Sequence, residues 1–298
     1  TGLFTAFSFL SINFYAQGIS KAGEDGQFKL AAWRETGALL GVCIAAVIPT
    51  LLLDYSEKPF AVFAYGFAAV TLIATAFMWT EWKAPVQQAP SNIREILSDA
   101  LTRRLLILAL VNATPLAVSS TPFLFFVDAR LGAAGWEGPL LLLFFLAAAV
   151  SSPLWSALAK RFGAKRTLLV AMVLAVLSFG YALTLGTGDV TQFAIICVLS
   201  GATIGADLTL LPAMFARRMA KISPNGGQGF GLWSLVSKFT LAFAAAVLLP
   251  LLEGSGFLSG QADVPETALT MLTVLYALVP SVLKCVAIVL LVTTNLED

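Results

Sequence analysis

Three charged side chains lie in the middle of long apolar stretches: Asp207, Lys238 and Lys284. Each stands about nine or ten residues from the nearest polar loop, which corresponds to roughly 14–15 Å along a helix. A charge at such a depth costs about 2.5–3.5 kcal/mol on membrane-insertion scales, and it is typical of ion pathways and substrate sites. These residues are therefore the first candidates for chemistry.

Asp207 and Lys238 lie on consecutive apolar stretches at matched depth, so the acid and the base can neutralise each other. In one interpretation they form a cation-coupling site, where a lysine and a carboxylate exchange partners as an ion or a substrate binds. In the other they are a static buried pair that fixes the register of two helices. Lys284 is flanked by apolar residues on the last stretch, and we expect it to extend toward the lipid headgroups.

Prolines interrupt several of these stretches, among them Pro115, Pro122, Pro212 and Pro280. A proline removes the hydrogen bond to the carbonyl four residues before it. At membrane depth this is tolerated where the segment is buried in protein or lines a cavity. Asn112 lies near the first of these breaks, so the pattern predicts a hydrated cavity wall with Asn112 as a solute-binding candidate; ordinary packing is the alternative.

The composition is that of a polytopic membrane protein. Of the 298 residues, 58% are hydrophobic and only 12% are charged, and the mean hydropathy is +0.87. The sequence contains no histidine, which excludes Ser-His-Asp catalysis and His-ligated metal sites. We therefore expect no enzyme, no catalytic residue and no bound metal or cofactor. The three cysteines stand alone within apolar runs, as small packing residues do.

The apolar runs have the length that a helix needs to cross about 30 Å of hydrocarbon, which predicts an all-α bundle. The loop 81–104 divides three spans from six and is predicted to be a cytoplasmic linker. On this basis residues 1–80 are the remnant of an N-terminal bundle, residues 105–298 form a six-span bundle, and three further spans are expected before Thr1. We predict nine spans, at about 1–19, 35–53, 60–80, 105–127, 137–159, 167–186, 190–216, 229–252 and 267–294.

The orientation follows from the basic residues of the loops. Basic clusters at 160–166 and 217–221 fall on one side of the predicted spans, whereas the opposite side carries only Lys58 and Arg130. Loops rich in Lys and Arg stay in the cytoplasm. The protein is therefore expected to be an integral membrane protein, of a bacterial inner membrane, with residues 151–166 inside.

The segment PLWSALAKRFGAKRTL resembles the cytoplasmic loop between the eighth and ninth spans of the major facilitator superfamily. With INFYAQGISKAGEDGQFKLAAWRETGALLG, LTRRLLILALVNATP and GFGLWSLVSKFTLAFAAA in the same order, the chain is most similar to the glycoside-pentoside-hexuronide:cation symporters, the melibiose permease-like family. The resemblance implies the superfamily fold, with this chain holding spans 4–12 of twelve. It also implies a conformational loop that contains Arg161, Gly163, Lys165 and Arg166, of which Arg161 and Arg166 are expected to contact span ends.

The same resemblance assigns roles to other positions. Lys238 matches the family lysine that faces the cation site, Arg34 an arginine near the sugar, and Tyr15 an aromatic residue of the sugar pocket. Ser11 stands where the family has a sugar-binding aspartate, which argues against a galactoside substrate. Trp233 lies in the matched GFGLWSLVSKF segment and is a further substrate-binding candidate.

The expected function is secondary active transport: symport of a sugar or glycoside-like solute with Na⁺ or H⁺, by alternating access. The expected partners are a small solute and the lipid bilayer, with no nucleic acid, and the protein is expected to be a monomer. Two alternatives stay open. One is a transporter of another solute, such as a lysolipid or amphiphile, and the other is a non-transporting membrane sensor or scaffold with the same fold.

Overall fold

The computed structural model describes residues 2–80, 92–223, 227–254, 256 and 265–295. Every regular element among them is a helix, which confirms the predicted all-α class. The first half contains α1 (Gly2–Leu52), α2 (Pro59–Met78), α3 (Ile93–Ser98), α4 (Ala100–Ser120), α5 (Phe123–Phe125) and the π-helical turn η2 (Phe126–Arg130). The second half contains α6 (Glu137–Phe162), α7 (Ala164–Ala182), α8 (Val190–Ile222), α9 (Gly227–Gly254), α10 (Glu266–Thr273), the π-helical turn η3 (Val274–Leu278) and α11 (Val279–Thr293).

Eight helices of the described residues are long and apolar enough to cross a membrane. They correspond to eight of the nine predicted spans, with α10, η3 and α11 forming one continuous crossing. The predicted span 1–19 is helical, but it is not one of these eight candidate spans. Ser8, Ser11, Asn13 and Gln17 lower its hydropathy, as is typical of a helix that faces a polar cavity.

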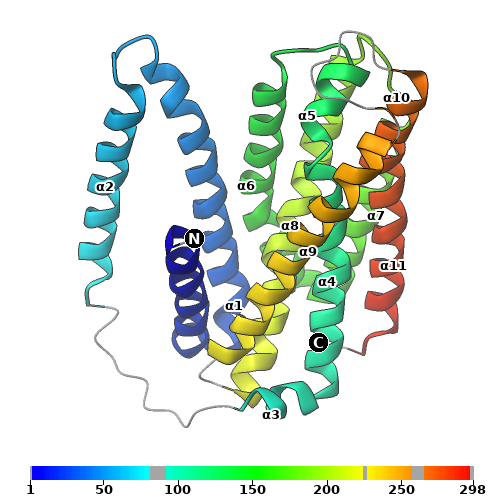
Figure 1. Ribbon diagram of the computed structural model, residues 1–298. Coiled ribbons are helices and arrows are strands. Elements are labelled where there is room, and N and C mark those ends of the chain that lie inside the picture. Colours follow the sequence, from blue (N-terminus) through cyan, green and yellow to red (C-terminus); the bar gives the residue numbers. More distant parts are fainter. Residues whose placement is uncertain (1, 81–91, 224–226, 255, 257–264, 296–298) are drawn as a thin grey trace.

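A sharp kink at Gly23 divides α1 into two arms. Gly23 has φ 60° and ψ −168°, a conformation that is open essentially to glycine alone. The chain reverses there, so the N-terminal arm, residues 2–22, lies beside the second arm, residues 24–52 (Figure 1). The Gln27 side chain ties the two arms together by donating to the carbonyls of Gly18 at 3.3 Å and Ile19 at 3.4 Å.

The largest group of buried side chains lies where α8 packs against α1, α4, α6 and α7 (Figure 1). Helices α6 and α8 approach closely at two glycines. A Cβ atom on Gly201 would meet the carbonyl of Phe144, and one on Gly205 would meet the carbonyl of Ala148. These two glycines thus serve helix packing, since small residues let helix backbones approach in a membrane.

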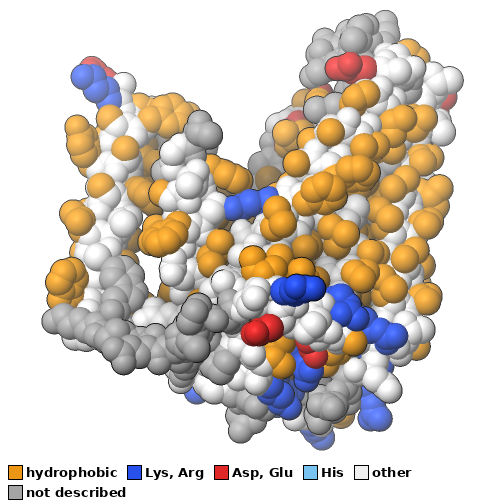
Figure 2. All heavy atoms as spheres, turned by 60° about the horizontal axis from the view of Figure 1, so that its bottom comes forward, with side chains coloured by type: hydrophobic (Ala, Val, Ile, Leu, Met, Phe, Trp, Pro, Cys, Tyr) orange, Lys and Arg blue, Asp and Glu red, His pale blue; other side chains and the backbone are white. Residues whose placement is uncertain are grey.

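Helices α1 and α2 lie to one side of the bundle that α4 to α11 form (Figure 1). Helix α2 has no buried residue, whereas the second arm of α1 is joined to α6, where Ser156 donates to the Phe28 carbonyl at 3.0 Å. Figure 2 shows the surface hollowed between these two parts, with a basic side chain in its wall. Much of the predicted linker, including Lys83, lies outside the described residues, and the division into two bundles stays a prediction.

Candidate functional site

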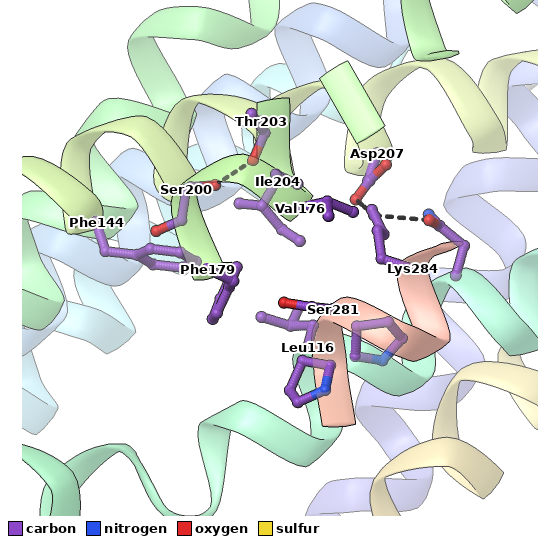
Figure 3. A pocket seen from close by; sticks show the side chains of 14 residues that line it. Leu116, Phe144, Val176, Phe179, Ser200, Thr203, Ile204, Asp207, Ser281 and Lys284 are labelled. Carbon is purple, nitrogen blue, oxygen red and sulfur yellow. Dashed lines mark hydrogen bonds and ion pairs between the residues drawn. The ribbon is translucent and has the colours of Figure 1, made fainter. Parts of the chain in front are cut away.

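Asp207 on α8 and Lys284 on α11 form a buried ion pair (Figure 3). Their side chains are only 7% and 6% exposed. Lys284 Nζ also donates to Asn112 Oδ1 on α4 at 2.7 Å. The pairing of Asp207 with Lys238 that the sequence suggested is therefore wrong, and so is the expectation that Lys284 extends to the headgroups. A buried ammonium is stable only beside such partners.

Irregular turns set the directions of these side chains. Lys284 lies one turn after Pro280, which itself follows η3. Since a π-helical turn holds more residues than an α-helical turn, it offsets the face on which all later residues lie. Asn112 lies one turn before Pro115 in α4. The register of a regular helix therefore does not predict which residues meet Lys284.

A cavity of about 30 Å³ adjoins the pair, enough for one or two water molecules. It is lined by residues of α4, α6, α7, α8 and α11, mainly apolar ones, together with the hydroxyl side chains of Ser200, Thr203 and Ser281. Pro115 and Pro280 both border it. Asp207 Oδ1 is buried and has no hydrogen-bond partner among the described residues. A small cavity thus lies near the proline breaks, but its lining is mainly apolar, and a hydrated wall stays a prediction.

Lys238 lies elsewhere, at the seam between α9 and the N-terminal arm of α1. Its ammonium donates to the Ser8 hydroxyl and lies 5.0 Å from the centre of the Phe4 ring. Both partners are neutral, and among the described residues no carboxylate pairs with Lys238. Within the described part of the chain, a hydroxyl and an aromatic ring thus hold this positive charge.

A second polar cluster lies at the same seam and contains Tyr15, Arg34 and Glu35. Glu35 Oε1 accepts hydrogen bonds from the Tyr15 hydroxyl and from Arg34 Nε, both at 2.9 Å. The Arg34 guanidinium lies 3.6 Å from the centre of the Tyr15 ring. Phe230 of α9 packs against Tyr15, with 4.9 Å between the two ring centres. The kink at Gly23 makes this cluster possible, because it brings the two arms of α1 side by side.

The other predicted solute-binding residues do not join this cluster through a direct polar contact. Ser11 donates to the carbonyl of Phe7 in its own helix at 2.7 Å. Trp233 packs on Phe215 at 4.9 Å between ring centres. Asn112 belongs to the Lys284 site. Of the five residues predicted to bind solute, the structure thus joins only Tyr15 and Arg34 directly.

The predicted conformational loop is a tight turn between α6 and α7. Gly163, with φ 87°, ends one helix and begins the next. Lys165 donates to the carbonyls of Val292 at 3.0 Å and Thr294 at 2.7 Å, so it fastens the turn to the end of α11. Arg161 instead lies over the ring of Phe162 in its own helix.

Arg166 is exposed and makes no polar contact with a helix end in the part of the chain that the structure describes. Arg161 thus contacts Phe162, the last residue of its own helix, and a contact of Arg166 with a span end stays a prediction. Figure 2 shows Lys and Arg side chains gathered at this end of the molecule, as the predicted orientation requires.

Sequence reasoning missed Ser8, Glu35 and the role of Lys284. Glu35 follows Arg34 directly and stands at the predicted start of a span, so its charge was not counted among those inside spans. Lys284 has the same predicted depth in the membrane as Asp207, and this matched depth is the sequence signal for the ion pair that the two residues form. Ser8 carried no signal, because a serine in a span commonly bonds only its own helix.

A family model described as MFS/sugar transport protein matches residues 1–298. A search of curated proteins found no significant match. The matched family, the eight candidate spans and the all-helical bundle agree with one another. The chain therefore belongs to the MFS/sugar transport protein family, and it is an integral membrane transporter of the major facilitator superfamily.

Proposed function

We propose that this protein carries a sugar or glycoside-like solute across the membrane together with Na⁺ or H⁺, by alternating access. One observation carries the proposal: the N-terminal arm of α1 joins a charged, aromatic cluster through Tyr15 and contacts the Lys238 ammonium through Ser8, an ammonium whose partners among the described residues are neutral. Such groups are costly within a membrane and persist where they serve a transport path. Family membership supports a transporter rather than an enzyme.

The chemistry of Tyr15, Arg34 and Glu35 suits a sugar. A sugar offers hydroxyl groups that both donate and accept hydrogen bonds, and its ring has an apolar face. Arg34 supplies donors, Glu35 supplies acceptors and Tyr15 supplies an aromatic face, all within one contact network. A lysolipid would need a long apolar groove in addition, so the cluster favours a polar solute.

Lys238 is proposed to couple cation entry to movement. In the structure its ammonium joins α9 to the N-terminal arm of α1 through Ser8. A cation arriving at the seam repels this ammonium, which releases Ser8 and loosens the contact between the two parts. The driving force is the ion gradient, whose electrical part is about 2.3 kcal/mol per charge for each 100 mV.

The test is uptake into vesicles that contain the purified full-length protein. A panel of radiolabelled pentoses, hexoses and glycosides is offered with an inward Na⁺ or H⁺ gradient. For a solute that accumulates, Lys238→Ala should abolish uphill accumulation but retain exchange of solute at equal concentrations. Lys58→Ala is the matched control, because Lys58 is exposed in the turn before α2.

Unchanged uphill accumulation in Lys238→Ala would refute the coupling role. Uptake of lysophosphatidylcholine with none of the sugars would favour the amphiphile alternative. Movement of none of these solutes would favour a sensor or scaffold.

A further inference from the structure

Two basic side chains bind the last turn of α11, and a third lies next to them in the sequence. Arg104 of α4 donates to the Thr293 carbonyl at 3.0 Å. Lys165 of α7 donates to the Thr294 carbonyl at 2.7 Å. Arg166 follows directly in the first turn of α7 and is exposed. The end of α11 thus brings basic residues of two neighbouring helices together.

No carboxylate among the described residues pairs with these three cations. The ion pairs of the described residues join other side chains, and Asp99 at the start of α4 binds Arg218. The acceptors that Arg104 and Lys165 use are backbone carbonyls, and a whole helix end carries only about half a negative charge. An arginine has five N–H donors and a lysine three, more than these contacts use. Most of the positive charge is therefore left for an anion.

The three cations lie at the depth of the lipid head groups. Arg104 stands near the start of α4, Lys165 and Arg166 stand in the first turn of α7, and α11 ends at Thr293. All three helices belong to candidate membrane spans. Since the ends of such spans reach the polar border of the bilayer, the cluster faces head groups whichever way the protein is oriented.

The surface that continues from this cluster toward the membrane centre is apolar. On α7, exposed apolar residues follow Arg166 at helical spacing, which places them on one face: Val170, Val173 and Leu177. On α11, exposed apolar residues lie near the same end: Val286, Val289 and Val292. Figure 2 shows basic side chains at this end of the molecule with apolar side chains beside them. A cationic end that continues as an apolar face matches an anionic head group with acyl chains.

We propose that Arg104, Lys165 and Arg166 bind the phosphate head group of an anionic phospholipid, with its acyl chains along the exposed apolar faces of α7 and α11. The arginines supply a planar fork of donors that suits phosphate oxygens, and the lysine supplies a point charge. Basic clusters between spans at a membrane surface are typical of such sites. A zwitterionic lipid carries its own ammonium, which the cluster repels. The inference goes beyond the proposed sugar symport and does not depend on it.

Two competing explanations make different predictions. If the three cations serve only the membrane orientation and the end of α11, the folded protein does not distinguish lipid head groups. The other possible occupants are the chain's own carboxylates, Glu297 and Asp298, which lie outside the described residues. If they fill the cluster, Glu297→Gln/Asp298→Asn should create a preference for anionic lipid that wild type lacks.

The experiment measures lipid binding to the purified full-length protein in detergent by native mass spectrometry. The probes are phosphatidylglycerol and phosphatidylcholine with the same acyl chains. We expect wild type to bind phosphatidylglycerol at least fivefold more tightly. Arg104→Gln/Arg166→Gln should lose this preference, because each basic residue at a lipid surface contributes about a factor of five in affinity. Arg94→Gln/Lys29→Gln is the matched control, because it removes the same charge from exposed positions on α3 and α1.

Arg166→Gln alone keeps the inference testable if the double variant does not fold, because Arg166 makes no polar contact with a helix end within the described ranges. It should weaken phosphatidylglycerol binding about fivefold and leave phosphatidylcholine binding unchanged. Inorganic phosphate at the same concentration should not displace the lipid, since it has no acyl chains. Equal binding of the two lipids to wild type, equal phosphatidylglycerol binding by wild type and Arg166→Gln, or displacement by phosphate would each overturn the inference.

Discussion

Replacing Asp99 by alanine should destabilise the junction between the linker and α4 in two ways. Asp99 is the N-cap of α4, and its Oδ2 accepts from the Thr102 backbone N–H at 2.8 Å and from the Thr102 hydroxyl at 2.6 Å. The same carboxylate binds Arg218 near the end of α8, with Nε 3.0 Å from Oδ2. One side chain thus starts one helix and ties it to another.

The two contributions can be estimated separately. Loss of an N-cap costs about 1 kcal/mol. The ion pair is partly exposed, with side chains 22% and 18% exposed, so about 1 kcal/mol is the appropriate value. Asp99→Ala should therefore lower the free energy of unfolding by about 2 kcal/mol. Asp99→Asn keeps a good cap but loses the charge, and it should lose only about half of this.

The pH dependence gives an independent check with a definite sign. The hydrogen bond from Arg218, followed by those from Thr102, holds the pKa of Asp99 well below its usual range. A carboxyl with a depressed folded-state pKa stabilises the protein above its unfolded pKa of about 3.9, and this stability is lost as the pH falls toward the folded value. The difference in stability between wild type and Asp99→Asn should therefore be constant near neutral pH and shrink below about pH 4.

The assay is thermal unfolding of the three purified proteins in detergent across this pH range. Equal stabilities of Asp99→Ala and Asp99→Asn would refute the capping argument. A difference between wild type and Asp99→Asn that did not change at low pH would refute the ion-pair argument.

Two further variants test packing and the cytoplasmic turn. Gly201→Val should destabilise the protein by about 1–3 kcal/mol, because its Cβ would meet the Phe144 carbonyl. Gly66→Ala on α2 has open space around it and should be nearly neutral in the same unfolding assay. Lys165→Ala should remove both hydrogen bonds to the end of α11 and speed hydrogen exchange in the last turn of that helix. Unchanged exchange there would show that Lys165 does not hold α11.

The sequence predicts most of the candidate spans because apolar length decides them locally, whereas the orientation from Lys and Arg stays a prediction. Eight predicted spans overlap the eight candidate helices, but Gly26–Leu52 begins nine residues before the predicted span 35–53, and Ala100–Ser120 ends seven residues before the end of the predicted span 105–127. The loop expected between the first two spans proved to be a kink at Gly23. The polar run SKAGEDGQFK around Gly23 is typical of a loop, but a single glycine with positive φ reverses the chain there and the residues on both sides are helical.

The partners of the charged residues were harder to predict. Matched depth made both Lys238 and Lys284 possible partners of Asp207, and proximity in the chain favoured the wrong one. The π-helical turn η3 changes the face of the helix on which Lys284 lies, and no sequence pattern predicts this turn. Glu35 and Ser8 likewise took their roles from tertiary contacts that the Gly23 kink creates.

The proposed coupling is tested most directly by cation movement that a solute evokes. Vesicles containing the purified full-length protein are held without an imposed gradient, and a sugar from the panel is added outside. The account predicts that Na⁺ or H⁺ enters with the sugar, recorded as uptake of radioactive Na⁺ or as alkalinisation of the medium. Sugar entry with no accompanying cation would contradict it.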